Sequence, residues 1–209
     1  MSLIDSLIQE GWLKTDSIKD AFQKIKREDF LPEDMKNLAE LNEALPIGSS
    51  QTISQPLVVA FMLEQLQPKA GEKILDIGSG SGWTTALLAQ IVGGGPEAGR
   101  GRVIAIEIVP ELKEFGEKNV AKYNFIEKGI ACFVLADGSK GLPEEAPFDK
   151  ILASASAGEI PLEWKEQLKI GGKIVAPVGN SIKTIFKKSE TEFEEIDHLG
   201  FVFVPLISE

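Results

Sequence analysis

An apolar run that leads directly into three alternating glycines is the feature that most constrains how this chain folds. The run Lys73–Ile77 is short and apolar, as in a buried β-strand, and residues 84–92 are apolar at helical spacing. Between them, Gly78, Gly80 and Gly82 allow the backbone to turn sharply and a ligand to lie directly against it. A strand, a glycine loop and a helix in this order are typical of the nucleotide-binding crevice of a doubly wound α/β sheet.

The spacing of these glycines separates two classes of ligand. A dinucleotide-binding loop requires G-x-G-x-x-G, but here the third glycine comes one residue early and Trp83 follows it. The G-x-G-x-G form, with Asp76 two residues ahead, is similar to the loop of S-adenosylmethionine-dependent methyltransferases. We therefore expect S-adenosyl-L-methionine as the cofactor and S-adenosyl-L-homocysteine as the product, with Asp76, Gly78, Ser79 and Gly80 at the site. Taken alone, the loop is also compatible with a tight turn that binds nothing.

Acidic residues close the next two predicted strands. Glu107 ends the strand Arg102–Glu107, where an acidic side chain accepts hydrogen bonds from ribose hydroxyls in a βαβ nucleotide site, and Ile108 follows it. Asp137 and Gly138 follow the strand over residues 130–135, and Asp137 is placed to accept from an adenine amino group. Each acid has a plainer explanation, a surface glutamate in one case and an Asp-Gly turn in the other. Their coincidence with the glycine loop favours the cofactor site.

The order of elements predicts an α/β fold, a Rossmann-like, doubly wound and mostly parallel sheet with helices on both faces. An antiparallel strand near the C-terminus and a small N-terminal helical extension complete it. We expect residues 1–55 to form this extension and a loop that covers the cofactor, and residues 56–209 to form the methyltransferase core. The expected helices are 2–8, 17–25 (with Asp16 or Ser17 as N-cap and a stop at residues 30–32), 56–67, 83–92, 110–121 and 161–168. Residues 37–55 are expected to be mostly irregular, and the expected strands are 73–77, 102–107, 130–135, 149–154, 172–178, 184–187, 192–196 and 201–206.

Composition and charge exclude several functional classes. The net charge is −10, and no cluster of Lys and Arg is long enough to form a groove that follows phosphates, so we expect no nucleic-acid partner. The single cysteine, Cys132, excludes an internal disulfide and is interpreted as a small core residue. No signal peptide and no apolar segment of about 18–20 residues is found, so we expect a cytoplasmic monomer that does not bind membranes.

Residues with acid–base or metal-binding chemistry are scarce. His198 is the only histidine, and no Cys/His set has the spacing of a metal site, so we expect no metal. A catalytic triad is not supported, because the sequence has no G-x-S-x-G elbow. Transfer of a methyl group to a carboxylate needs no base, since that oxygen is already ionised at neutral pH. The small and hydroxyl-bearing residues at 151–158 suit an oxygen acceptor better than an amine.

The segment LPIGSSQTISQP at residues 45–56 closely resembles the signature of the protein-L-isoaspartate O-methyltransferase family. The resemblance extends over nearly the whole chain. It includes REDFLP at residues 27–32, the glycine loop, DG at 137–138, APFD at 146–149, GG at 171–172, PVG at 177–179 and FVFVPL at 201–206.

The resemblance implies an enzyme that methylates the free α-carboxylate of L-isoaspartyl residues in damaged proteins and peptides. The ester then cyclises to a succinimide, which hydrolyses in part to normal aspartate. By resemblance, Thr52, Ile53 and Ser54 form the loop that covers the cofactor, and Ser54 is the active-site serine. Its expected role is to orient the carboxylate, and it is equally placed as a loop or N-cap serine ahead of the helix that begins at Pro56.

One departure and two alternatives remain open at this point. After this serine the family often has Pro-His-Met, whereas this chain has aliphatic side chains at Leu57, Val58 and Val59. Their effect on substrate affinity is not decided by the sequence. The alternatives are a methyltransferase of the same fold that acts on another protein or peptide carboxylate, and a binding module that has lost turnover.

Overall fold

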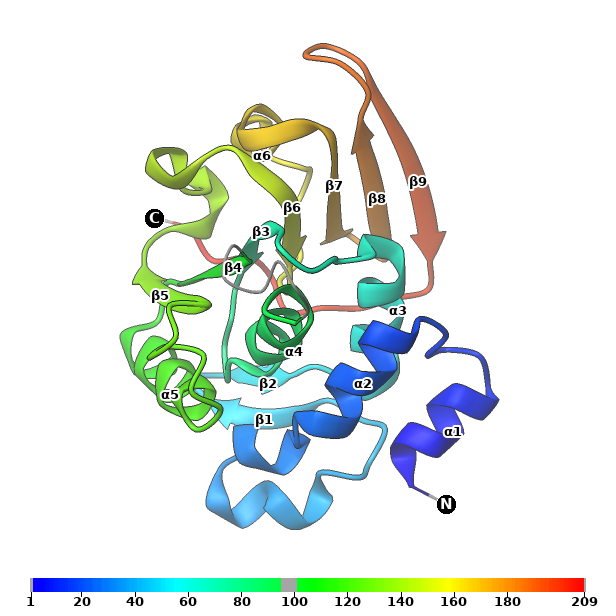
Figure 1. Ribbon diagram of the computed structural model, residues 1–209, viewed down its shortest axis with the longest axis vertical. Helices are drawn as coiled ribbons and strands as arrows, with labels where there is room; N and C mark the ends of the chain where they lie inside the picture. The colour runs from blue at the N-terminus through cyan, green and yellow to red at the C-terminus, as the bar shows by residue number, and fades with distance from the viewer. Residues whose placement is uncertain (1, 95–100, 209) are drawn as a thin grey trace.

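A computed structural model describes residues 2–94 and 101–208 of the chain (Figure 1). Seven strands form one sheet in the order β5-β4-β3-β6-β7-β8-β9, and a separate hairpin pairs β1 with β2. The strands are β1 (Leu45–Gly48), β2 (Gln51–Ile53), β3 (Lys73–Ile77), β4 (Arg102–Glu107), β5 (Ala131–Leu135), β6 (Phe148–Ala153), β7 (Leu168–Val178), β8 (Ser181–Lys187) and β9 (Phe193–Leu199). Pairing is parallel from β5 to β7 and antiparallel from β7 to β9.

Helices cover both faces of this sheet, which confirms the predicted doubly wound α/β class. The α-helices are α1 (Leu3–Gln9), α2 (Asp16–Lys24), α3 (Pro56–Leu66), α4 (Trp83–Val92), α5 (Pro110–Ala121) and α6 (Leu162–Gln167). Short 3₁₀ turns are η1 (Arg27–Phe30), η2 (Glu33–Leu38), η4 (Gly138–Lys140) and η5 (Pro143–Glu145). One buried apolar cluster unites α1 to α5 with one face of the sheet, and a second packs the other face against α6 and the turns beside it.

Side-chain alternation along the central strand explains this two-sided burial. In β3, Ile74 belongs to the first cluster, whereas Leu75 and Ile77 belong to the second. Successive side chains of a strand point to opposite faces, so Asp76 shares the face of Ile74, against α4. The strand is therefore buried on both faces, as expected of a parallel sheet that is covered on both sides.

Several predicted elements differ from the structure. The β1–β2 hairpin was not predicted, since residues 37–55 were expected to be mostly irregular; its apolar Leu45, Ile47 and Ile53 are buried. Residues 201–206 are not a strand; in the described chain they run beside residue 156 and form one isolated bridge, between Ser156 and Pro205. In Figure 1 this red segment returns from β9 across the molecule toward the β5 side.

The predicted range of the second helix, 17–25, agrees with α2 to within one residue at each end, but its N-cap and its stop signal differ from prediction. Its N-cap is Thr15 rather than Asp16 or Ser17, and the Thr15 hydroxyl donates to Glu64 Oε2 of α3 at 2.7 Å instead of capping its own helix. The helix ends at Lys24, and the separate turn η1 lies between this end and the predicted stop signal at residues 30–32. A tertiary contact thus replaces the local cap.

Among the described residues, no helix is long and apolar enough to span a bilayer.

Candidate active site

A pocket lies at the carboxyl ends of β3, β4 and β6, where the strand order reverses direction across the sheet. The chain passes from β3 outward to β4 and β5, then crosses to β6 on the other side of β3. Such a reversal leaves a crevice beyond the strand ends, which is where open α/β sheets bind their ligands. The pocket lining is Ile47, Gln51, Thr52, Ile53, Ser54, Ile77, Gly78, Ser79, Gly80, Ser81, Trp83, Thr84, Ile106, Glu107, Ile108, Val109, Gly138, Ser154, Ala155, Val204, Pro205, Leu206 and Ile207.

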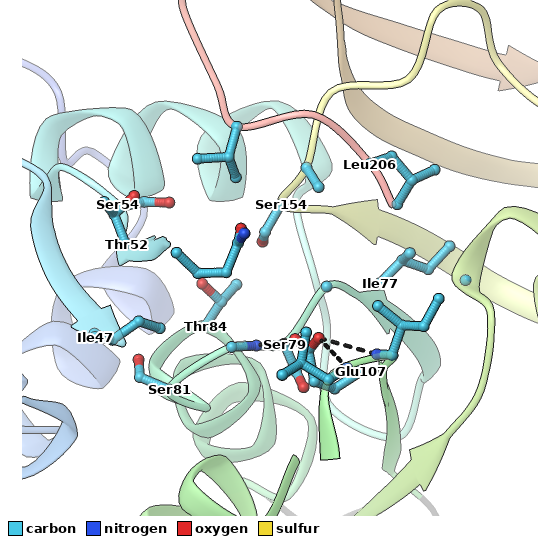
Figure 2. A pocket seen from close by; sticks show the side chains of 18 of the residues that line it. Ile47, Thr52, Ser54, Ile77, Ser79, Ser81, Thr84, Glu107, Ser154 and Leu206 are labelled. Atoms are coloured by element: carbon cyan, nitrogen blue, oxygen red, sulfur yellow. Dashed lines mark hydrogen bonds between the residues drawn. The ribbon is translucent and has the colours of Figure 1, made fainter. Parts of the chain in front are cut away.

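Figure 2 shows how distant segments build the walls of this pocket. Thr52 and Ser54 come from the hairpin and the loop after it, and Leu206 comes from the C-terminal segment. Glu107 lies among the strand ends, and Ser154 follows β6. Sequence positions separated by more than half of the chain therefore enclose one cavity.

The glycine loop is shaped for close approach of its neighbours. Gly78, Gly80 and Gly82 all have positive φ, at 74°, 50° and 83°. A Cβ on Gly82 would lie 2.7 Å from the carbonyl oxygen of Gly116 in α5, too close for any real side chain. Asn119 of the same helix donates to the Ser81 carbonyl at 3.1 Å. The loop is thus fixed from behind by α5, and its other surface is left facing the pocket.

Glu107 is buried, with 6% of its surface exposed, and its carboxylate is held by backbone donors. Oε2 accepts from the Gly80 N–H at 2.8 Å, and Oε1 accepts from Ile108 and Val109 at 2.9 and 3.0 Å. A carboxylate has about four lone-pair sites, so Oε2 keeps capacity for one further donor. This arrangement joins the glycine loop to the end of β4 and presents an acceptor to the pocket.

Asp76 lies behind the glycine loop rather than on the pocket wall. It is fully buried, its Oδ2 accepts from the Thr85 hydroxyl at 2.6 Å, and its Oδ1 has no hydrogen-bond partner among the described residues. Burial raises the pKa of Asp76 to about 7; the Thr85 hydrogen bond opposes this rise and the charge of Glu107 adds to it. Direct contact of Asp76 with a cofactor stays a prediction.

Asp137 and Gly138, which follow β5, have different roles. Asp137 caps η4, accepting from the Ser139 N–H at 2.9 Å and the Ser139 hydroxyl at 2.7 Å, and it is not among the residues that line the pocket. Gly138 does line the pocket, and a Cβ there would meet Ile77 Cγ2 at 2.5 Å. Only glycine fits at this first position of η4, which packs against the end of β3. The predicted adenine contact of Asp137 is likewise untested.

The predicted covering loop reaches the pocket, and a second groove begins at it. Thr52, Ile53 and Ser54 all line the pocket. The second groove shares Thr52, Ser54, Ser154 and Val204 with the pocket, and its other lining residues are Ala44, Gln55, Val58, Val202 and Phe203. Ser54 and Ser154 are therefore accessible from two cavities that meet.

Several lining residues escaped prediction from the sequence. The C-terminal segment Val204 to Ile207 had no signal of its own, since a short apolar run is equally typical of a strand. Ile47 and Gln51 belong to the unpredicted hairpin. Ser154 and Ala155 were noticeable as small residues after the fourth core strand, but not as pocket residues.

Neither the histidine nor the cysteine lines the pocket. The His198 ring contacts Phe61 edge to face at 5.1 Å, and its Nε2 lies 3.3 Å from the Thr184 hydroxyl. Cys132 is partly buried and accepts from Arg102 at 3.4 Å. Within the described ranges, no three His, Cys, Asp or Glu side chains are grouped to hold a metal ion.

Comparisons with known proteins agree on one family. The family model described as protein-L-isoaspartate(D-aspartate) O-methyltransferase matches residues 1–209. The chain is 40% identical over 211 residues to a protein-L-isoaspartate O-methyltransferase of Methanopyrus kandleri, covering 99% of this chain and 90% of that one. It is 39% identical to the protein of the same name from Staphylothermus marinus, covering 99% and 93%.

Solved structures give the same result for the fold. A Plasmodium falciparum protein described as a protein-L-isoaspartate O-methyltransferase, in complex with S-adenosyl-L-homocysteine, superposes with a TM-score of 0.89 at 24% identity. That comparison covers 99% of this chain and 97% of the other. A second structure with the family's name has a TM-score of 0.84 at 27% identity, over 97% of this chain and 64% of that one. The resemblance predicted from residues 45–56 is confirmed, and the chain belongs to the protein-L-isoaspartate(D-aspartate) O-methyltransferase family.

Proposed function

We propose that this protein uses S-adenosyl-L-methionine to methylate the free α-carboxylate of L-isoaspartyl residues, with Ser54 at the point of transfer. Family membership supports the reaction. The observation that carries the assignment of Ser54 is the meeting of two cavities at Thr52, Ser54 and Ser154. One cavity lies over the glycine loop, and the other opens along apolar side chains that suit a peptide. A methyl donor and a carboxylate that approach from the two sides would meet there.

The pocket residues fit S-adenosyl-L-methionine. Glu107 Oε2 offers an acceptor to a ribose hydroxyl, and the positive φ of Gly78 and Gly80 lets a ligand lie against the backbone. Ser79 Oγ and Trp83 Nε1 are buried and have no hydrogen-bond partner in the described protein, and both residues line the pocket. Buried polar groups usually find partners, so we assign these two to the bound cofactor.

The chemistry requires positioning rather than proton transfer. The cofactor supplies an electrophilic methyl group on a sulfonium. The substrate carboxylate is ionised at neutral pH, so its oxygen attacks the methyl carbon with its own lone pair, and the bond from carbon to sulfur breaks. An ester and the neutral thioether S-adenosyl-L-homocysteine result. We assign Ser54 to donate a hydrogen bond to the carboxylate, which holds the attacking oxygen in line with the bond from the methyl carbon to sulfur. Such orientation of the reactants supplies much of the rate acceleration.

Transfer of a labelled methyl group to matched peptides tests this function. A peptide that contains isoaspartate should be methylated, and the same peptide with normal aspartate should not, because it has no free α-carboxylate at that position. Equal methylation of both peptides would favour an enzyme that modifies other carboxylates. Cofactor binding by calorimetry without turnover on any peptide would favour a binding module.

The same proposal includes the partner and the compartment. We propose that the protein acts as a cytoplasmic monomer on isoaspartyl-containing proteins, and not on nucleic acid or at membranes. The net charge of −10 supports this, since a nucleic-acid surface needs clustered positive charge. Light scattering on the purified chain measures the oligomeric state, and a stable dimer would contradict that part of the proposal.

A further inference from the structure

Arg27 is a buried arginine whose hydrogen bonds all go to backbone carbonyls. It lies in η1, and 7% of its surface is exposed. Nη1 donates to the carbonyls of Ala39 and Leu41 at 3.1 and 2.8 Å. Nη2 donates to the carbonyls of Glu43 and Ser54 at 2.7 and 3.3 Å. One planar side chain therefore ties the segment 39–43 to the loop that carries Ser54.

The turn that presents Arg27 is itself fixed from the side of α5. The Tyr123 hydroxyl accepts from the Lys26 N–H at 2.9 Å and donates to Asp29 Oδ2 at 2.7 Å. The Tyr123 ring stacks on Phe30 with centroids 5.9 Å apart. Residues on both sides of Arg27 are thus held against the body of the molecule, so its guanidinium is aimed by a rigid turn.

The segment that Arg27 holds also clamps the Ser54 loop a second time. Asn42 lies between two of the carbonyls that Arg27 binds, and its Oδ1 accepts from the Leu57 N–H at 3.0 Å. The Asn42 carbonyl accepts from Gln55 Nε2 at 2.9 Å. Residues 54–57 are therefore fixed directly by Arg27 and indirectly through Asn42.

The other surface of the guanidinium faces the cofactor side of the site. Arg27 Cζ lies 5.4 Å from the centroid of the Trp83 ring, and Trp83 begins α4 and lines the pocket. We infer that Arg27 is a positioning residue, which sets the Ser54 loop at a fixed distance from Trp83 and the glycine loop. Lysine cannot replace it, because an ammonium is a point charge and lacks the planar fork that reaches four carbonyls.

The inference rests on the proposed role of Ser54, and its test combines kinetics with hydrogen exchange of the full-length protein. In R27K and R27Q, we expect kcat/KM for an isoaspartyl peptide to fall about tenfold to hundredfold, with a smaller change in affinity for S-adenosyl-L-homocysteine. Amides of residues 51–55 and of Leu57 should exchange faster in both variants. The matched control is I18V, which shortens a buried side chain of α2 in the apolar cluster that joins α1 to α5 with the sheet.

The outcomes separate this inference from the proposed function. I18V should keep wild-type kinetics and wild-type exchange at residues 51–57, since a general loss of stability alone does not move the loop. If R27Q does not fold, R27K decides; wild-type kcat/KM and unchanged exchange in R27K would overturn the inference. If the wild-type protein methylates no isoaspartyl peptide while R27K still loosens residues 51–57, the proposed function fails and the positioning role stands.

Discussion

At the scale of single residues, the proposed site depends on side chains that position the reactants rather than on general acids and bases. In the free protein, Glu107 accepts three hydrogen bonds from backbone N–H groups. Arg27 donates four hydrogen bonds to backbone carbonyls. Ser54 is one of three hydroxyl-bearing residues, with Thr52 and Ser154, that line both cavities. Such a site accelerates a reaction by holding a nucleophile that is already ionised.

Substitution of Ser54 by alanine tests this at the reacting end. S54A should lower kcat/KM for an isoaspartyl peptide about tenfold to hundredfold, the effect of losing one hydrogen bond to a charged group, about 1.5–3 kcal/mol. Affinity for S-adenosyl-L-homocysteine, measured by calorimetry, should stay close to that of the wild type. A large loss of cofactor affinity with normal peptide kinetics would place Ser54 on the cofactor instead.

The buried carboxylate of Asp76 makes stability depend on pH. Burial raises its folded-state pKa to about 7 from an ordinary value of 3.8. The folded chain then binds the proton more tightly than the unfolded chain, so this contribution to stability is complete below pH about 3.8. It is lost as the pH rises toward and through about 7. Each pKa unit corresponds to about 1.4 kcal/mol, so the change amounts to a few kcal/mol.

Urea unfolding of the wild type and D76N across this pH range measures the effect. The neutral amide cannot ionise, so the stability of D76N relative to the wild type should rise steadily from pH about 4 to about 8. E107Q serves as the control, because it removes the neighbouring charge and should reduce the slope without abolishing it. Parallel profiles for the wild type and D76N would show that Asp76 keeps an ordinary pKa in the folded protein.

At the scale of elements, the sequence predicts the core more fully than the walls of the pocket. The bounds of β3, α4, β4 and α5 agree with prediction, because each has a short, largely apolar run or a helical period and has Gly or Pro at or beside at least one end. The β1–β2 hairpin was missed because its apolar residues are interrupted by Pro46 and Gly48. The course of residues 201–208 depends on tertiary contacts with residue 156, which no local pattern reveals.

The C-terminal segment serves both cavities, and this predicts separable effects. Leu206 lines the pocket over the glycine loop, where we propose that the cofactor binds, whereas Val202 lines the second groove and not this pocket. L206S should weaken binding of S-adenosyl-L-homocysteine several-fold, because part of an apolar wall becomes polar. V202S should instead raise KM for an isoaspartyl peptide, since Val202 is 91% exposed in the free protein and can be covered by a bound peptide. Cofactor affinity should stay unchanged in V202S. Equal effects of both variants on both ligands would mean that the segment moves as one piece.

At the scale of the whole molecule, the fold brings the ends of the central strands and the N-terminal region together at one end of the sheet. Parallel strands deliver Gly78, Glu107 and Ser154 to the same end of the sheet. The N-terminal region contributes the Ser54 loop, and it shares its buried apolar cluster with α4 and the central strands. The strand ends and the Ser54 loop therefore pack on the same core, which holds them at a fixed separation.

The net charge of −10 predicts which isoaspartyl peptides react fastest. Among the residues that the structure describes, no charged side chain lines the second groove, so a preference for peptide charge has to come from the long-range field of the molecule. An isoaspartyl peptide flanked by lysines should have a higher kcat/KM than one flanked by glutamates, up to about tenfold at low salt. The ratio should shrink as the screening length falls from about 30 Å at 0.01 M to about 8 Å at 0.15 M salt. Initial rates for both peptides across this salt range measure it. A preference that does not change with salt would require a charged contact close to the bound peptide, which the lining of the groove does not provide.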